Sequence, residues 1–246
     1  MITLSSLIEQ TTTLSLSGVR ESLLFQSETT QYHSLSFEER LFHLFEAEIN
    51  QREDKRIKRM LSVAKLKDKN ASLDQVEYLS KRGLDKSVIL SLATCEFINK
   101  NQNILITGAT GVGKSFLAQA LARKAIFSGY STKYYRVTSL LQEIKMARLD
   151  GSYTKTLAKM SKFKLLILDD FGVTPLQGDE ISNLFEIIEE RIFAGALIIT
   201  AQLPIKEWHA YLGNETIADA MMDRLIHTAH KIELKGDSMR KILANN

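Results

Sequence analysis

The sequence NILITGATGVGKSFLAQALARKAIFS, residues 103–128, decides the fold of this chain. It begins with an apolar run at residues 104–106 that is typical of a buried parallel strand. Residues 108–115 then match the phosphate-loop pattern G-x-x-x-x-G-K-S/T in full. Apolar residues at helical spacing follow and predict a helix that ends before Gly129. A strand before the loop and a helix after it distinguish a phosphate-binding loop from a chance match.

The residue types in this loop suit a bound polyphosphate. The glycines let the backbone present N–H groups to a phosphate without an intervening Cβ, and the next helix points its N-terminal amides at the same anion. Lys114 can neutralise the β- and γ-phosphates, and the Ser115 hydroxyl is a hard oxygen ligand for Mg²⁺. The sequence therefore predicts a nucleoside triphosphate site formed by Gly108, Ala109, Thr110, Gly111, Val112, Gly113, Lys114, Ser115 and Phe116.

Composition narrows the possible classes of protein. The chain has 246 residues, of which 44% are apolar and 25% charged, as in ordinary globular proteins. No run of 18 apolar residues and no secretion signal is present, so we expect a cytoplasmic protein without a membrane span. The single Cys95 predicts a buried thiol in a reducing compartment. His227 and His230 lack further ligands, so no metal other than Mg²⁺ is expected.

Basic residues are concentrated in two segments, although the net charge is only +3. Residues 52–69 contain eight basic and three acidic residues. Contact with a phosphate backbone and a solvated helix face with internal ion pairs explain this excess about equally well. For the second segment, residues 145–164, ordinary surface lysines are the commoner explanation. The DNA-contact candidates are Arg52, Lys55, Arg56, Arg59, Lys145, Arg148 and Lys155.

The region before the phosphate loop reads as a helical domain followed by a linker. Residues 1–35 are rich in Ser, Thr and Leu and have a weak helical signal. Ser36 to Glu39 form a capping-box pattern, and apolar residues then recur on one face of a long helix. Residues 69–72 lack periodicity, and residues 85–98 predict one helix. We therefore predict a helical N-terminal domain at residues 1–70 and a nucleotide-binding domain at residues 71–246.

Two further apolar strands end in polar side chains. Residues 164–170, KLLILDD, end in Asp169 and Asp170, and residues 195–202, GALIITAQ, include Thr200 and Gln202. Ligands gather at the carboxyl ends of strands in an open parallel sheet. Asp169 can therefore hold Mg²⁺ beside the loop, and Asp170 can orient or deprotonate the attacking water. Either Thr200 or Gln202 can hydrogen-bond that water.

These motifs in this order resemble the AAA+ ATPases, within the branch that contains the IstB transposition helpers and the DnaC-like helicase loaders. The likeness covers nearly the whole chain. It lies in the blocks TGATGVGKS, LLILDDFGVTPL, ITAQLPIKEWH, TIADAMMDRLIH and IELKGDSMRK, which look specifically like IstB. The resemblance implies an α/β AAA+ core, with a five-stranded parallel sheet between helices, preceded by a small helical domain.

The resemblance also implies roles for single residues in binding and hydrolysing ATP with Mg²⁺. Asp169 takes the place of the metal ligand, Asp170 that of the catalytic glutamate, and Gln202 that of the sensor asparagine. The shorter Asp170 side chain suggests hydrolysis that is slow unless a partner stimulates it. Arg224 in MDRL matches an arginine finger that acts on a neighbouring subunit, and Arg240 in SMR matches the second sensor.

The implied activity is ATP-dependent assembly on duplex DNA, remodelling of target DNA, recruitment of the cognate transposase and regulation through hydrolysis. A helicase loader that binds single-stranded DNA and a replicative helicase is the alternative within this fold. The QLPIKEWH and IELKGDSMR blocks favour the transposition helper. An ATP-gated adaptor with little turnover is the alternative from another class.

Overall fold

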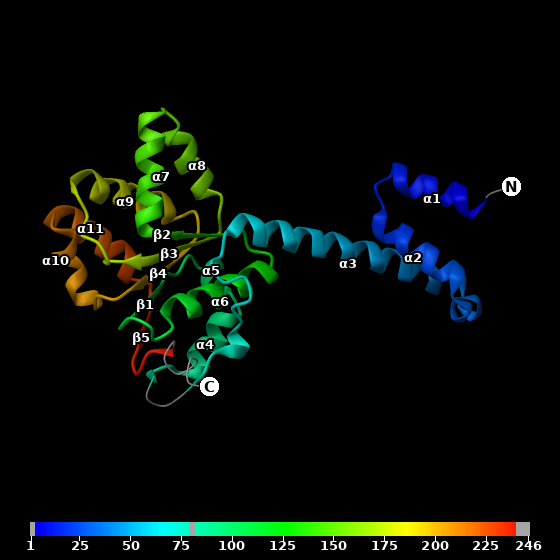
Figure 1. Cartoon of the computed structure of the whole chain (residues 1–246), viewed down its shortest axis with the longest axis horizontal. Coiled ribbons are helices and arrows are strands. Elements are labelled where there is room, and N and C mark those ends of the chain that lie inside the picture. Colours follow the sequence, from blue (N-terminus) through cyan, green and yellow to red (C-terminus); the bar gives the residue numbers. More distant parts are fainter. Residues whose placement is uncertain (1–2, 79–81, 240–246) are drawn as a thin grey trace. The chain divides into compact units, whose positions relative to one another are not determined.

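The computed structural model describes residues 3–78 and 82–239, which form two compact units divided between Arg59 and Met60 (Figure 1). The division falls within one long helix, α3 (Phe37–Ala64). Ala64, Leu66 and Ala71 are buried and belong to the second unit. The division between the two compact units thus lies before the domain boundary predicted near residue 70, and that domain boundary stays a prediction.

The first unit is helical. It consists of α1 (Leu4–Thr13), α2 (Ser17–Glu28), the 3₁₀ helix η1 (Thr30–Ser34) and the first part of α3. The predicted capping box is present, because the Ser36 N–H donates to Glu39 Oε2 (2.8 Å) and the Glu39 N–H donates to Ser36 Oγ (3.2 Å). The weak helical signal of residues 1–35 therefore hid two regular helices.

The second unit is built on five parallel strands in the order β2-β3-β4-β1-β5, which confirms the predicted α/β class. The strands are β1 (Ile104–Gly108), β2 (Thr132–Arg136), β3 (Leu165–Phe171), β4 (Ala196–Ala201) and β5 (His230–Leu234). Chain order and sheet order differ, so β1 lies between β4 and β5. The strand that precedes the phosphate loop is consequently an interior strand, and it is buried.

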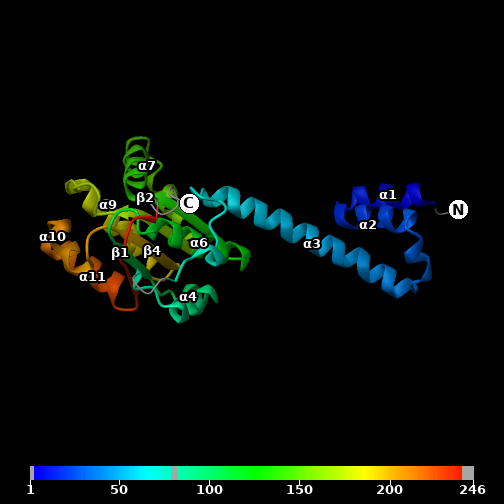
Figure 2. The same ribbon diagram turned by 60° about the horizontal axis from the view of Figure 1, so that its bottom comes forward.

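Helices cover both faces of this sheet (Figures 1 and 2). One side carries η2 (Leu73–Gln75), α4 (Lys86–Ala93), α5 (Glu96–Asn99) and α6 (Lys114–Phe127). The other carries α7 (Val137–Leu149), α8 (Tyr153–Ser161), α9 (Gly178–Arg191), η4 (Ile205–Glu207), α10 (Trp208–Leu212) and α11 (Glu215–Ile226). Residues 85–98 form two helices instead of one, because Cys95 adopts a left-handed backbone (φ 63°) between α4 and α5.

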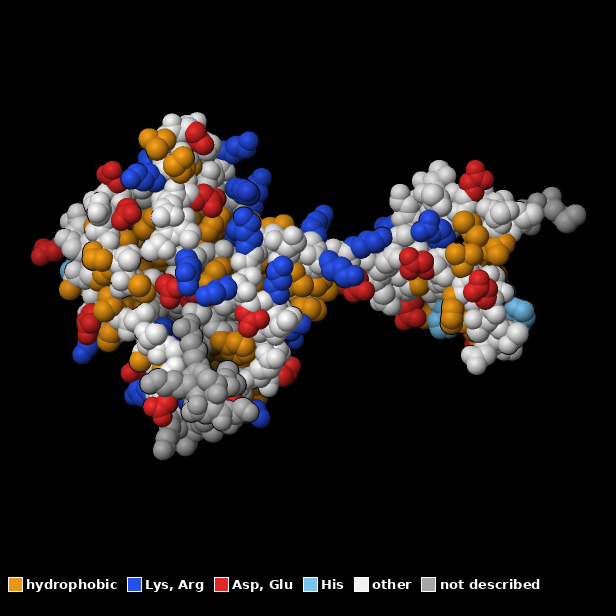
Figure 3. All heavy atoms as spheres, in the orientation of Figure 1, with side chains coloured by type: hydrophobic (Ala, Val, Ile, Leu, Met, Phe, Trp, Pro, Cys, Tyr) orange, Lys and Arg blue, Asp and Glu red, His pale blue; other side chains and the backbone are white. Residues whose placement is uncertain are grey.

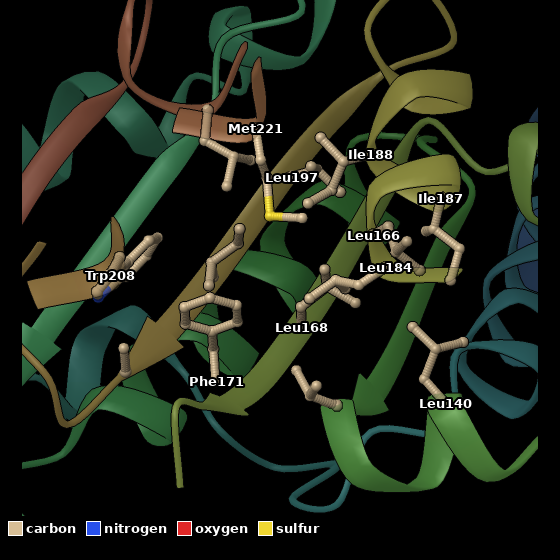
Figure 4. Packing of buried hydrophobic residues seen from close by; sticks show 14 of the residues in the cluster. Leu140, Leu166, Leu168, Phe171, Leu184, Ile187, Ile188, Leu197, Trp208 and Met221 are labelled. Atoms are coloured by element: carbon tan, nitrogen blue, oxygen red, sulfur yellow. The ribbon is translucent and has the colours of Figure 1, made fainter. Parts of the chain in front are cut away.

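The main core lies between the sheet and the second group of helices. Figure 4 shows Leu166 and Leu168 of β3 facing Leu184, Ile187 and Ile188 of α9, with Phe171 and Trp208 at the carboxyl end of β3. All of these side chains are at most 2% exposed. Because this packing fixes β3 against its neighbours, the two carboxylates near the end of the strand are held on a rigid element.

Candidate nucleotide-binding site

The phosphate loop joins β1 to α6 in the predicted way. Gly108 and Gly113 have φ values of 143° and 98°, and Gly113 lies directly before the first residue of α6. A Cβ on Gly108 would lie 2.2 Å from the Leu234 carbonyl oxygen of β5. Glycine is therefore required here both by the backbone angles and by the close approach of the neighbouring strand.

Lys114 is held against the loop that precedes it. Its Nζ donates to the carbonyl oxygens of Gly108 and Ala109, each at 2.8 Å, and the residue is only 7% exposed. Burial lowers the pKa of Lys114, while the carboxylates of Asp170 and Asp169 oppose that shift. An ammonium group with this little solvation gains from an incoming phosphate, which would replace neutral carbonyl partners with a charged one.

Asp169 is almost completely enclosed, with 2% of its surface exposed. Its Oδ1 accepts hydrogen bonds from Ser115 Oγ (2.8 Å) and Thr200 Oγ1 (2.5 Å), and its Oδ2 accepts one from the Tyr134 hydroxyl (2.6 Å). Burial and the hydrogen bond to Asp169 raise the pKa of Tyr134, so the phenol remains a donor. Three elements thus converge on one carboxylate.

This donor set fits Mg²⁺, which prefers hard oxygen ligands and usually takes only one or two carboxylates together with phosphate oxygens and water. Ser115 and Asp169 would hold the ion, which supplies charge neutralisation at the phosphates. In the part of the chain that the structure describes, no group of three or more His, Cys, Asp or Glu residues could form a metal site made by the protein alone.

Asp170 differs from Asp169 in backbone and exposure. The β3–β4 register shifts between Leu168 and Phe171, and Asp170 has a φ of 63°, a value that non-glycine residues rarely adopt. Its N–H donates to Thr200 Oγ1 (3.1 Å) and its carboxylate pairs with Arg136 Nε (3.4 Å). The irregular backbone turns the Asp170 carboxylate towards the cleft beside the loop, where it is one of the lining residues.

That cleft has a volume of about 560 Å³, and its lining includes Thr110, Lys114, Ser115, Asp170 and Gln202. Apolar side chains also line it, among them Val76, Leu84, Phe116 and Leu234, together with Glu77 and Arg82. A hollow of about 920 Å³ borders β5 and shares Gln202 and Leu234 with this cleft, but Lys114, Ser115 and Asp170 do not line it. The cleft of 560 Å³ is therefore the candidate site, because residues of the phosphate loop and Asp170 line it together with apolar side chains that suit a nucleobase.

Several residues of the site were not predicted. Tyr134 and Arg136 contact the two carboxylates from β2. Arg82, at 8% exposure, donates to the carbonyl oxygens of Glu77 and Val112, each at 2.8 Å, and so links Glu77 to the phosphate loop. Sequence patterns do not show which strand lies beside β2, so they could not reveal the contacts of Tyr134 and Arg136.

The structure distinguishes the two sensor candidates. The Thr200 hydroxyl is fully buried and occupied by Asp169 and the Asp170 N–H. Gln202 lines the cleft, and its Oε1 accepts a hydrogen bond from Thr110 Oγ1 (2.9 Å). Gln202 is therefore the better placed of the two to reach a γ-phosphate.

Of the two arginines implied by the resemblance, Arg224 lies among the described residues and away from the cleft. Arg224 on α11 is ion-paired with Glu189 on α9, and its Nη1 donates to the Ala220 carbonyl oxygen (2.8 Å). It does not line the cleft of its own chain. Arg240 lies outside the described residues.

The DNA-contact candidates fall into two groups. All seven are exposed, and Figure 3 shows basic side chains gathered over the second half of α3. In the first group, the charged end of the side chain makes a hydrogen bond or ion pair with other residues: Arg52 (with Glu48), Lys55 (with Ser17 and Gln51), Arg56 (with Glu53) and Arg148 (with Asn183 and Glu186). Within residues 3–78 and 82–239, no hydrogen bond or ion pair involves the charged groups of Arg59, Lys145 and Lys155.

In the same residues, no helix has the length and apolar character needed to cross a membrane.

The sequence matches the family of IstB-like ATP-binding proteins over residues 9–245. It is 38% identical to an insertion sequence ATP-binding protein of Sinorhizobium fredii, and the alignment covers 95% of both chains. It is 40% identical to the ATP-binding protein of insertion sequence IS1162 from Pseudomonas fluorescens, over 78% of this chain and 83% of the relative.

Solved structures share the fold at low identity. The DnaC helicase loader matches 68% of this chain and 97% of its own, with a TM-score of 0.56 and 19% identity. DnaA from Aquifex aeolicus with bound AMPPCP matches 72% of this chain and 55% of its own, with a TM-score of 0.57 and 18% identity. These likenesses confirm the predicted AAA+ fold.

Proposed function

This chain belongs to the IstB-like ATP-binding proteins of insertion sequences, and on that premise we propose that it is an ATP-hydrolysing transposition helper. The observation that carries the proposal is a cleft lined by Lys114, Ser115, Asp170 and Gln202. Asp169 is hydrogen-bonded to the Ser115 hydroxyl beside it. ATP would bind with its phosphates in the loop and its base against Val76 and Leu84. Mg²⁺ would lie at Ser115 and Asp169.

In this proposal, the residues of the chain divide the work of hydrolysis. Lys114 and the N-terminal amides of α6 stabilise negative charge on the phosphates. Asp170 accepts the proton of the attacking water, and Gln202 orients that water or the γ-phosphate. The carboxylate of Asp170, the proposed base, is engaged in an ion pair with Arg136. This contact favours slow turnover by the isolated subunit and keeps the ATP-gated adaptor as the second candidate.

Assembly is the next part of the proposal. Arg224 does not line its own cleft, which is consistent with a finger that completes the site of a neighbouring subunit. ATP would then join subunits head to tail on duplex DNA, and the assembly would remodel target DNA and recruit the transposase. The relatives, which are ATP-binding proteins of insertion sequences, support a transposase as the partner.

Particle mass measured by light scattering tests this function. We expect large assemblies when a non-hydrolysable ATP analogue and duplex DNA are both present, and small particles when either is omitted. Assembly only on single-stranded DNA would favour the helicase-loader alternative. Small particles under every condition would favour the adaptor.

Replacing the proposed base separates hydrolysis from binding. We expect Asp170→Asn to lose phosphate release, keep ATP binding and hold its assemblies longer than the wild type. An adaptor with little turnover would behave the same before and after the substitution.

A further inference from the structure

We propose that Tyr134 is a positioning residue that fixes the magnesium-holding carboxylate of Asp169. This inference rests on the proposed function, since it concerns how the same site holds Mg²⁺ and ATP. Tyr134 would not touch nucleotide or metal; it would act only through Asp169.

The contact is short and enclosed. Tyr134 lies on β2, next to β3 in the sheet, and is 8% exposed. Its hydroxyl donates to Asp169 Oδ2 at 2.6 Å, a length typical of a hydrogen bond to an ionised acceptor. In the parallel pairing of β2 with β3, Tyr134 lies opposite Ile167, two residues before Asp169.

The three donors to Asp169 have different consequences. Ser115 and Thr200 both donate to Oδ1, from α6 and β4. Tyr134 is the one hydroxyl in the described chain that donates to Oδ2. Without it, Oδ2 loses its fixed direction, and the carboxylate can rotate away from the orientation that Ser115 and the ion require. Groups that orient a metal-holding side chain in this way commonly contribute 10- to 100-fold to metal affinity or activity.

Packing alone does not explain a tyrosine at this position. A phenylalanine would fill nearly the same space on a buried strand without carrying a hydroxyl that needs a partner. Tyr134 places its hydroxyl on the functional carboxylate. Its neighbour Tyr135 instead donates to Glu143 at 3.2 Å, away from that carboxylate, so the two adjacent residues provide a matched pair.

The test compares Tyr134→Phe with Tyr135→Phe in the full chain. Binding of a fluorescent, non-hydrolysable ATP analogue is titrated with Mg²⁺ and repeated in EDTA. We expect Tyr134→Phe to raise the Mg²⁺ concentration for half-maximal binding about 10-fold, with binding in EDTA unchanged. Tyr135→Phe should match the wild type in both measurements, and p-aminophenylalanine at position 134, which restores a donor, should recover most of the loss.

The outcomes separate this inference from the proposed function. A wild-type protein whose nucleotide binding ignores Mg²⁺ overturns both. A wild type that depends on Mg²⁺, together with a Tyr134→Phe variant that has the same dependence, overturns only the role of Tyr134. An equal loss of binding in EDTA and in Mg²⁺, or a failure of the aminophenylalanine variant to recover, would reduce Tyr134 to a packing residue. If Tyr134→Phe unfolds, the aminophenylalanine variant alone decides, because the proposal requires near-normal Mg²⁺ dependence from it.

Discussion

Gly108 lies where the phosphate loop meets the neighbouring strand, and it offers a test at the scale of one residue. A methyl group there would collide with the Leu234 carbonyl oxygen, at 2.2 Å. We expect Gly108→Ala to lower the free energy of unfolding by at least about 1 kcal/mol and to abolish nucleotide binding, as measured by urea unfolding and analogue titration.

Gly178 is the matched control, because a Cβ on this first residue of α9 would meet no atom within 4 Å. Gly178→Ala should leave the unfolding free energy within about 0.5 kcal/mol of the wild-type value and leave nucleotide binding intact. Equal effects of the two substitutions would show that the close approach of β5 to Gly108 does not cause the loss of stability and nucleotide binding.

At this scale, the residues that a motif specifies were predictable and their supporting partners were not. The roles of Lys114, Ser115 and Asp169 were predicted from local patterns, because a phosphate loop and an apolar strand ending in a carboxylate each indicate a function. Tyr134 and Arg136 lie about 35 residues from their partners in sequence. Their roles depend on β2 lying beside β3, which no local pattern specifies.

At the scale of elements, the first unit depends on a carboxylate from α3 that caps α2. Glu48 Oε2 accepts hydrogen bonds from the N–H groups of Gly18 (2.7 Å) and Val19 (3.2 Å), and Oε1 pairs with Arg52 (2.6 Å). Burial alone would raise the pKa of Glu48, but the hydrogen bonds from Arg52, Val19 and Gly18 outweigh it and lower the pKa below 4.5.

The sign of the pH dependence follows from that lowered pKa. The stabilising contribution of Glu48 is complete above pH 4.5, its ordinary pKa, and is lost as the pH falls through the lower value of the folded state. We expect Glu48→Gln to cost about 2 kcal/mol at neutral pH and to remove this part of the acid sensitivity. Hydrogen exchange of the Gly18 and Val19 amides measures this loss of stability locally. Glu46 has a half-exposed side chain, so in the control variant Glu46→Gln these amides should exchange at the wild-type rate.

The basic segment of α3 gives a second test at this scale. The charged groups of Lys58 and Arg59 have no hydrogen bond or ion pair within the described residues, whereas Arg148 is bonded to Asn183 and Glu186 and stacks on Tyr153. If α3 contacts DNA phosphates, Lys58→Gln with Arg59→Gln should reduce the slope of log affinity against log salt concentration by about two. Arg148→Gln should instead lower thermal stability and leave that slope unchanged. An unaltered slope in the double variant would assign this segment to the solvated helix face.

Elements with strong periodicity were predicted well, and the failures have local causes. The strands β1, β3 and β4 and the helix after the phosphate loop follow from apolar runs at strand and helix spacing. Helices α1 and α2 were hidden because Ser and Thr dilute their apolar pattern, and α2 depends on Glu48, a residue distant in sequence. The break at Cys95 arises from a left-handed backbone at a non-glycine residue, which sequence patterns do not mark.

At the scale of the whole molecule, Arg224 tests whether ATP joins subunits. Its ion pair with Glu189 means that a loss of function in Arg224→Ala could come from disturbed packing between α9 and α11. Glu189→Ala breaks the same pair and leaves the guanidinium in place. We expect Arg224→Ala to lose ATP hydrolysis at least 10³-fold relative to the assembled wild type, and Glu189→Ala to retain most of it.

Mixing two inactive variants then shows on which subunit the arginine acts. Lys114→Ala subunits should fail to bind ATP but still present Arg224, whereas Arg224→Ala subunits should bind ATP without a finger. In a head-to-tail assembly of equal parts, roughly a quarter of the interfaces combine an intact ATP site with an intact finger from the neighbour. Hydrolysis should therefore reappear in the mixture on duplex DNA. If Arg224 acted within its own subunit, no mixture of these variants would contain a complete site, and activity would stay at the level of the separate variants.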